Sequence, residues 1–108
     1  MTTKDFLITE VRGLFAASKN LEYRSRVVRS FHAFINFLQA NGLTTRQILA
    51  AEEPVTESLR IMKSDLTDEG FEVVKAAYDK WLRGHDRGKE IEDVSVLEKA
   101  LAKLRQAP

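Results

Sequence analysis

The sequence predicts an all-α fold, a compact single-domain bundle of about five helices. Apolar residues recur at spacings of three and four along most of the chain, as they do on one face of an amphipathic helix. Helix-capping residues stand before most of these periodic stretches. No two alternating apolar runs are joined by a hairpin turn, so strand signals are almost absent. We expect residues 1–108 to form one helical domain, because a chain of 108 residues supports one hydrophobic core and not two.

The central helix is expected at residues 22–40, where neither Gly nor Pro interrupts the chain. At about 100° per residue, its large apolar side chains fall within one broad arc. These are the side chains of Tyr23, Val27, Val28, Phe31, Phe34, Ile35 and Leu38. A helix with so much aromatic and branched surface has to pack against several partners, so we expect it at the centre of the fold.

Shorter helices are expected on both sides of the central one. A first helix is predicted at residues 3–16, with a threonine before it as N-cap. Gly42 favours the end of the central helix, since it suits the left-handed position after a last helical turn. A short helix is predicted next, at residues 45–51, where Thr44 and Gln47 have the spacing of a capping box.

Residues 55–62 carry a pattern that two structures can explain. Three apolar residues, the first of them Val55, would share one face of a helix. In a strand, Leu59, Ile61 and Lys63 would alternate. We predict a helix here, with the strand as the alternative. A strand would favour a winged-helix arrangement of this region.

Two longer helices are expected in the C-terminal half, at residues 68–83 and 94–105. Thr67 can cap the first of them, and Asp68 and Glu69 place negative charge at the positive end of its dipole. Both helices repeat apolar residues at a three-four-three spacing, which is typical of helices that pack against a core.

The string Leu-Thr-Asp-Glu-Gly at residues 66–70 is similar to the Leu-Thr-x-x-Gly of winged-helix regulators of the bacterial multiple-antibiotic-resistance type. In those proteins it leads from the wing into the dimerisation helix. The similarity covers these five residues, and the chain lacks the second wing strand and a convincing recognition helix. The capping signals account for the same residues as a helix start, so no family is assigned.

Motifs for catalysis, metal binding or cofactor binding are not found, so we expect a protein that is not an enzyme and uses no cofactor. His32 and His85 are far apart in the sequence, and neither has a second ligand at a zinc-site spacing. The segment Gly84–Lys89 lacks the glycine spacing of a phosphate-binding loop and the Ser or Thr after its lysine. We interpret that segment as a polar connector.

Protein–protein interaction is the function that these patterns favour, either with a partner protein or with a second copy of the chain. Trp and Tyr anchor interfaces well because they bury a large area with few rotatable bonds. The expected binding residues lie at and beyond the end of the helix at 68–83. They are Tyr78, Trp81, Lys80, Arg83, Arg87 and Lys89.

A nucleic-acid-binding protein of helix-turn-helix type is the alternative. Its two helices would occupy residues 45–51 and 55–62. The arginines that could contact phosphates or bases are Arg24, Arg26, Arg29 and Arg46. The net charge is only +1, so any attraction to phosphates would depend on local clusters of this kind.

The composition favours a cytoplasmic protein that does not enter the membrane. The chain has no cysteine, which fits a reducing compartment. No apolar run approaches the roughly 20 residues of a membrane-spanning helix. The N-terminus has no basic segment leading into an apolar stretch, which a secretory signal would need.

Overall fold

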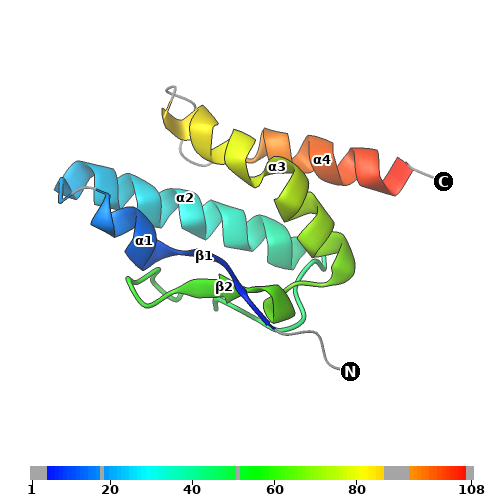
Figure 1. Ribbon diagram of the computed structural model, residues 1–108, viewed down its shortest axis with the longest axis horizontal. Coiled ribbons are helices and arrows are strands. Elements are labelled where there is room, and N and C mark those ends of the chain that lie inside the picture. Colours follow the sequence, from blue (N-terminus) through cyan, green and yellow to red (C-terminus); the bar gives the residue numbers. More distant parts are fainter. Residues whose placement is uncertain (1–4, 18, 51, 87–92, 107–108) are drawn as a thin grey trace.

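The computed structural model describes residues 5–17, 19–50, 52–86 and 93–106 (Figure 1). Its elements, in chain order, are β1 (Leu7–Glu10), α1 (Val11–Ala16), α2 (Leu21–Ala40), β2 (Arg60–Met62), the short 3₁₀ helix η1 (Lys63–Asp65), α3 (Asp68–Asp86) and α4 (Ser95–Gln106). The described residues thus hold four α-helices and one antiparallel sheet of two strands. The mostly helical fold is confirmed. The strict prediction of an all-α bundle of about five helices is wrong, because a sheet is present and two of the predicted helices are not formed.

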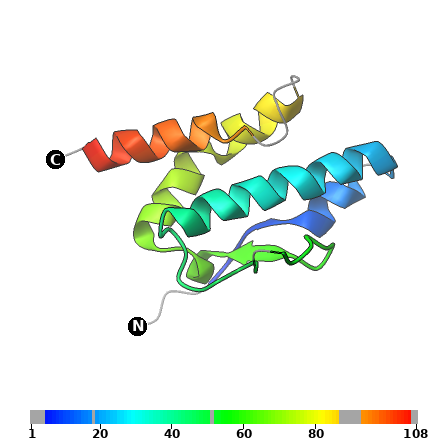
Figure 2. The same cartoon turned by 180° about the vertical axis from the view of Figure 1, so that it is seen from behind.

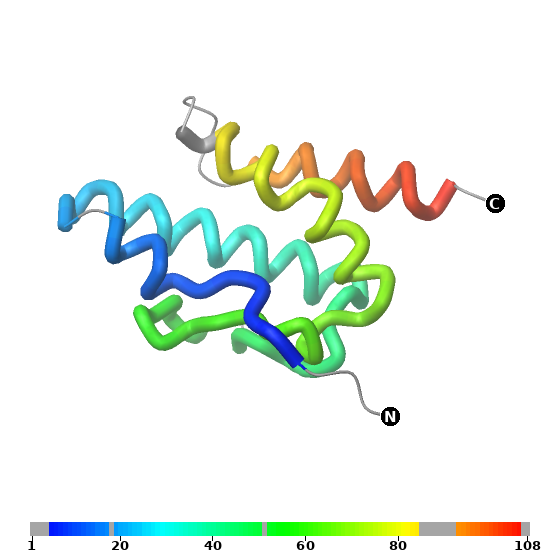
Figure 3. The backbone as a smooth tube through the Cα atoms, in the orientation of Figure 1, coloured from blue at the N-terminus to red at the C-terminus, as the bar shows by residue number. Residues whose placement is uncertain are grey.

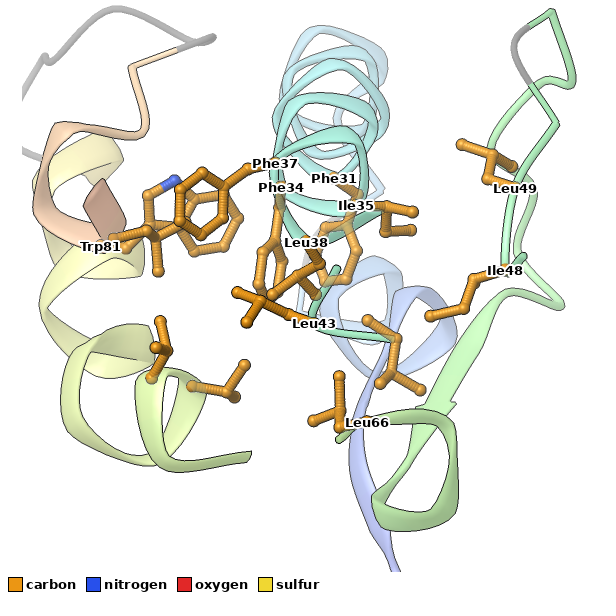
Figure 4. Packing of buried hydrophobic residues seen from close by; sticks show 14 of the residues in the cluster. Phe31, Phe34, Ile35, Phe37, Leu38, Leu43, Ile48, Leu49, Leu66 and Trp81 are labelled. Carbon is orange, nitrogen blue, oxygen red and sulfur yellow. The ribbon is translucent and has the colours of Figure 1, made fainter. Parts of the chain in front are cut away.

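α2 lies between two layers of structure, which Figures 1 and 2 show from opposite sides. β1, β2 and α1 lie along one side of it, and α3 and α4 lie along the other. The backbone trace in Figure 3 shows α3 and α4 running in opposite directions. Figure 4 looks into the core, where α2 has Trp81 of α3 on one side and the Ile48–Leu49 segment on the other.

α2 begins one residue before the predicted helix and ends at the predicted residue. The side-chain oxygen of Asn20 caps it by accepting a hydrogen bond from the Tyr23 N–H at 3.1 Å. Gly42, with φ of +68°, takes the left-handed conformation after its end. The buried residues of α2 are Val27, Ser30, Phe31, Phe34, Ile35, Phe37 and Leu38. Burial on such a wide arc follows from the two layers that cover this helix.

The predicted helix at residues 3–16 is wrong in its first half. Leu7–Glu10 form β1, which pairs antiparallel with β2 and places Thr9 opposite Ile61. The Thr9 side chain is buried, and its hydroxyl shares a 2.6 Å hydrogen bond with the Tyr78 hydroxyl. Both partners lie far along the chain, so the local pattern could not indicate the strand.

The predicted short helix at residues 45–51 is also wrong, because the described part of that segment is irregular. Its backbone groups bond to other segments instead of to one another. The Thr45 N–H donates to the Asp65 carbonyl oxygen at 2.9 Å. The Gln39 side-chain oxygen accepts hydrogen bonds from both N–H groups of residues 48–49, at 2.7 and 2.9 Å. These contacts satisfy polar groups that a helix would otherwise have paired internally.

The predicted helix at residues 55–62 is wrong as well, and the strand alternative holds for its last three residues. Arg60 is exposed and Ile61 is 1% exposed, as expected for alternate positions of a strand. β2 pairs with β1 near the N-terminus, not with a neighbouring strand as in a wing. Within the part of the chain that the structure describes, neither helix of the expected helix-turn-helix is present.

The start of α3 is anchored on the segment that follows α2. The Thr67 hydroxyl caps the helix by accepting a hydrogen bond from the Gly70 N–H at 3.0 Å. The Thr67 N–H donates in turn to the Leu43 carbonyl oxygen at 2.9 Å. A Cβ on Gly70 would overlap that same oxygen and lie 3.1 Å from the Leu43 Cβ. Gly70 is therefore required by the close approach of the two backbones.

Candidate functional site

A groove with a volume of about 550 Å³ lies between α3 and α4. Five lining residues come from each helix. They are Glu72, Val73, Ala76, Ala77 and Lys80 of α3, and Val96, Lys99, Ala100, Lys103 and Leu104 of α4. α3 and α4 lie side by side and run in opposite directions (Figure 3), and the groove takes its lining from both of them.

Small side chains leave this groove open. Ala76 and Ala77 of α3 and Ala100 of α4 contribute only methyl groups to its floor. Trp81 of α3 and Leu97 of α4 point into the core instead, where Trp81 is 1% exposed and Leu97 is fully buried. The helical period explains this division, because residues three or four apart share a face and the remaining positions point elsewhere.

The rim of the groove is positively charged. Lys80, Lys99 and Lys103 are exposed and line it. Glu72, the one carboxylate among the described lining residues, forms an ion pair of 3.1 Å with Lys75, which lies outside the groove. Among the residues that the structure describes, none of the three lining lysines forms an ion pair. The groove thus offers three ammonium groups around an apolar floor.

Of the six residues expected to bind a partner, Lys80 lies in this groove. Trp81 belongs to the core: its ring centroid lies 4.8 Å from that of Phe34 (Figure 4). Tyr78 is half-buried beside it, and its burial raises the pKa of the phenol above the ordinary value. Arg83 is exposed and donates to the Asp79 carbonyl oxygen on its own helix at 3.3 Å.

The remaining two expected partner-binding residues, Arg87 and Lys89, lie outside the described residues. The structure therefore brings Lys80 together with two lysines of α4 that were not predicted, and it removes Trp81 from any surface. A large aromatic on an amphipathic helix is explained here by core packing alone.

The four arginines of the nucleic-acid hypothesis do not form one cluster. Arg24 lies over the Phe15 ring at 4.9 Å, and Arg46 pairs with the buried carboxylate of Asp65 at 2.8 Å. Arg24 is near the start of α2, whereas Arg46 follows its end. Gln39, which binds the backbone of the segment that contains Arg46, lies fifteen helical residues after Arg24, or about 22 Å along α2. Two others, Arg26 and Arg29, are exposed on α2.

The α4 half of the groove was missed by the sequence analysis. Val96, Ala100 and Leu104 repeat every four residues beside the seam that packs into the core. This second apolar row, flanked by Lys99 and Lys103, was the available signal. Its significance depends on α4 lying against the alanines of α3, which the sequence does not reveal.

No group of three or more His, Cys, Asp or Glu side chains in the described part of the chain could hold a metal ion. His32 shares a hydrogen bond of 3.0 Å with Asn36, one turn along α2. The side chain of His85 lies outside the described residues. In the described part of the chain, no helix has the length and apolar character needed to cross a membrane.

Comparisons with known proteins gave no match for this chain among family models, curated proteins or solved structures.

Proposed function

We propose that this protein is a non-catalytic helical interaction module that binds another protein through the α3–α4 groove. The observation that carries the proposal is the groove's composition, an apolar floor of alanines and valines inside a rim of lysines. Protein interfaces have this organisation, in which an apolar centre excludes water and a polar rim stays solvated.

The alternative partner, a nucleic acid, uses less of what the groove offers. Phosphates would pair with Lys80, Lys99 and Lys103, but they gain nothing from the apolar floor. Base stacking would need exposed aromatic rings, and none is found among the described residues that line the groove. A protein partner uses both the floor and the rim, which favours it over a nucleic acid.

Site-specific photo-crosslinking tests the proposal. A benzophenone amino acid at Lys80, on the rim, is compared with the same group at Ala102, an exposed residue of α4 outside the groove. In an extract of the source organism, we expect position 80 to form an adduct with a protein that position 102 does not capture. That protein, purified, should bind the wild-type chain and lose at least tenfold in affinity on Ala76→Glu, while Ala102→Glu changes the affinity less than twofold.

Other adducts decide between the alternatives. Crosslinking to a second copy of the chain, with a dimer that Ala76→Glu converts to monomer in sedimentation, would make the interaction homotypic. Adducts with nucleic acid alone, or the same adducts from both positions, would contradict the proposal. The fluorescence of the single tryptophan, which is buried, checks that each variant is folded.

A further inference from the structure

We infer that the groove takes an amphipathic helix of a partner protein with acidic residues along the edge that faces α4. The inference rests on the proposed function and adds the chemistry of the partner. It follows from the shape of the groove, the size of its floor residues and the position of its charges.

The shape of the groove suits a helix better than an extended peptide. Both walls are helices, whose backbone N–H and C=O groups bond within the helix and are not available to a strand. A partner helix satisfies its own backbone and needs only side-chain contacts from the walls. The lining residues span residues 72–80 on α3 and 96–104 on α4, about 12 Å along each helix. That length matches roughly two turns of a third helix.

The floor residues call for large apolar side chains on the partner. Three alanine methyl groups fill little of a groove of about 550 Å³. Leucine or aromatic side chains from one face of a partner helix would fill it, at the spacings of three and four that place residues on one face. Buried anchors of this kind contribute most of the affinity in helix-in-groove complexes.

The charges set the remaining requirement. Lys99 and Lys103 are one turn apart on α4, so carboxylates one turn apart on the partner helix would face both of them. The edge of α3 is mixed, because Lys80 lies near one end of the groove and the paired Glu72 near the other. Charge complementarity at a rim acts mostly on association rate and choice of partner, so the acidic edge serves specificity.

A displayed library of helical peptides, selected for binding to the full chain, tests this inference. We expect the selected peptides to combine an apolar stripe with Asp or Glu on one flank. Their dissociation constants should rise at least tenfold on the double change Lys99→Glu and Lys103→Glu. The matched control changes two exposed cationic residues that do not line the groove, Lys19→Glu and Arg60→Glu, and should alter the constants less than threefold.

Two further outcomes separate failure of the inference from failure of the proposed function. The inference would be overturned if the selected peptides carry no acidic excess and bind the Lys99/Lys103 variant as well as they bind the wild-type chain. If those peptides still lose affinity on Ala76→Glu, the proposed function stands. Selected peptides that are indifferent to Ala76→Glu, or a library that yields no binder, would overturn both. The occupant would be a nucleic acid if no peptide is selected and the wild-type chain binds fluorescent random duplex DNA. In that case the Lys99/Lys103 change should abolish the DNA binding.

Discussion

The two faces of α3 differ in what fills the space beside them. One face places Trp81 against Phe34 of α2, with ring centroids 4.8 Å apart, and its residues are buried. The other carries Ala76 and Lys80 and lines an open groove. The first face is filled by side chains of its own chain, whereas the second lacks the volume to fill the space beside it. Changes on the first face should lower the free energy of unfolding, and changes on the second should leave the protein stable and alter the binding that we propose.

Removal of the Trp81 side chain should have the largest effect on the free energy of unfolding. Trp81→Ala would leave a cavity beside Phe31 and Phe34 and should lower the free energy of unfolding by about 4 kcal/mol. Urea unfolding followed by circular dichroism measures the change. Phe6→Ala is the control, because Phe6 is 45% exposed and should cost about 1 kcal/mol or less. Equal losses from the two changes would contradict the assignment of Trp81 to the core.

A side chain that crowds the start of α3 should have the next largest effect on the free energy of unfolding. Gly70→Ala places a methyl group against the Leu43 carbonyl oxygen, so the backbone has to move, and we expect a loss of about 3 kcal/mol. Gly13→Ala is the matched control on α1, where the nearest atom to the new Cβ is a Glu10 side-chain carbon at 3.6 Å. The control should stabilise the protein by up to about 1 kcal/mol, because Ala favours helix over Gly. Thermal unfolding of both variants measures the difference in sign.

Removal of the hydrogen bond between α3 and the sheet should lower the free energy of unfolding by a smaller amount, which depends on pH. Tyr78→Phe removes the 2.6 Å hydrogen bond to Thr9 and should cost about 1 kcal/mol near neutral pH. The pKa of the Tyr78 phenol is raised in the folded state by burial. Its neutral form is therefore the one that folding favours. The stability that the protonated Tyr78 phenol contributes is fully present below the unfolded-state pKa near 10, and it is lost as pH rises through the folded-state pKa.

A comparison of unfolding at pH 8 and pH 11 measures this loss. The wild-type protein should lose more stability between the two values than Tyr78→Phe does, since the variant lacks the titrating group. Tyr23→Phe controls for the other tyrosine of the chain. An equal pH dependence in wild type and Tyr78→Phe would contradict the role assigned to Tyr78.

The groove face should show the smallest effect on stability. Lys99→Glu with Lys103→Glu should change the free energy of unfolding by roughly 0.5 kcal/mol or less, because both side chains are exposed. Chemical denaturation measures the change. A loss as large as that of Gly70→Ala would mean that these lysines hold α4 in place, and the contrast between the two faces of α3 would fail.

At residues 45–50 sequence and structure disagree because polar partners outside the segment bind it. Asp65 accepts the Met62 N–H at 2.9 Å and pairs with Arg46, and this holds residues 45–50 away from a helical path. Gln39 likewise takes two backbone N–H groups from the same segment. Capping and periodicity signals at residues 44–48 were present, but a short helix is only marginally favourable, and these tertiary contacts outweigh it.

The candidate site was predictable to the same limited extent. Lys80 was predicted to bind a partner because it belongs to a basic cluster beside Trp81, yet the other two lysines of the groove lie on α4. Trp81 was expected at an interface because of its residue type, and the structure uses its ring to fill the core. Whether a large aromatic lies inside or outside depends on the rotation of α3 against α2, which composition does not specify.

Local pattern was enough for the long helices α2, α3 and α4, whose spans lie within three residues of those expected at each end. The backbone hydrogen bonds of a long helix lie within the helix, so its apolar period and its capping residues can be recognised in one continuous stretch of sequence. Packing between distant segments decided the pairing of β1 with β2, the irregular course of residues 45–50 and the groove. The two strands bond to each other, residues 45–49 bond to Gln39 and Asp65, and the groove is lined by both α3 and α4, so none of the three is specified by one stretch of chain.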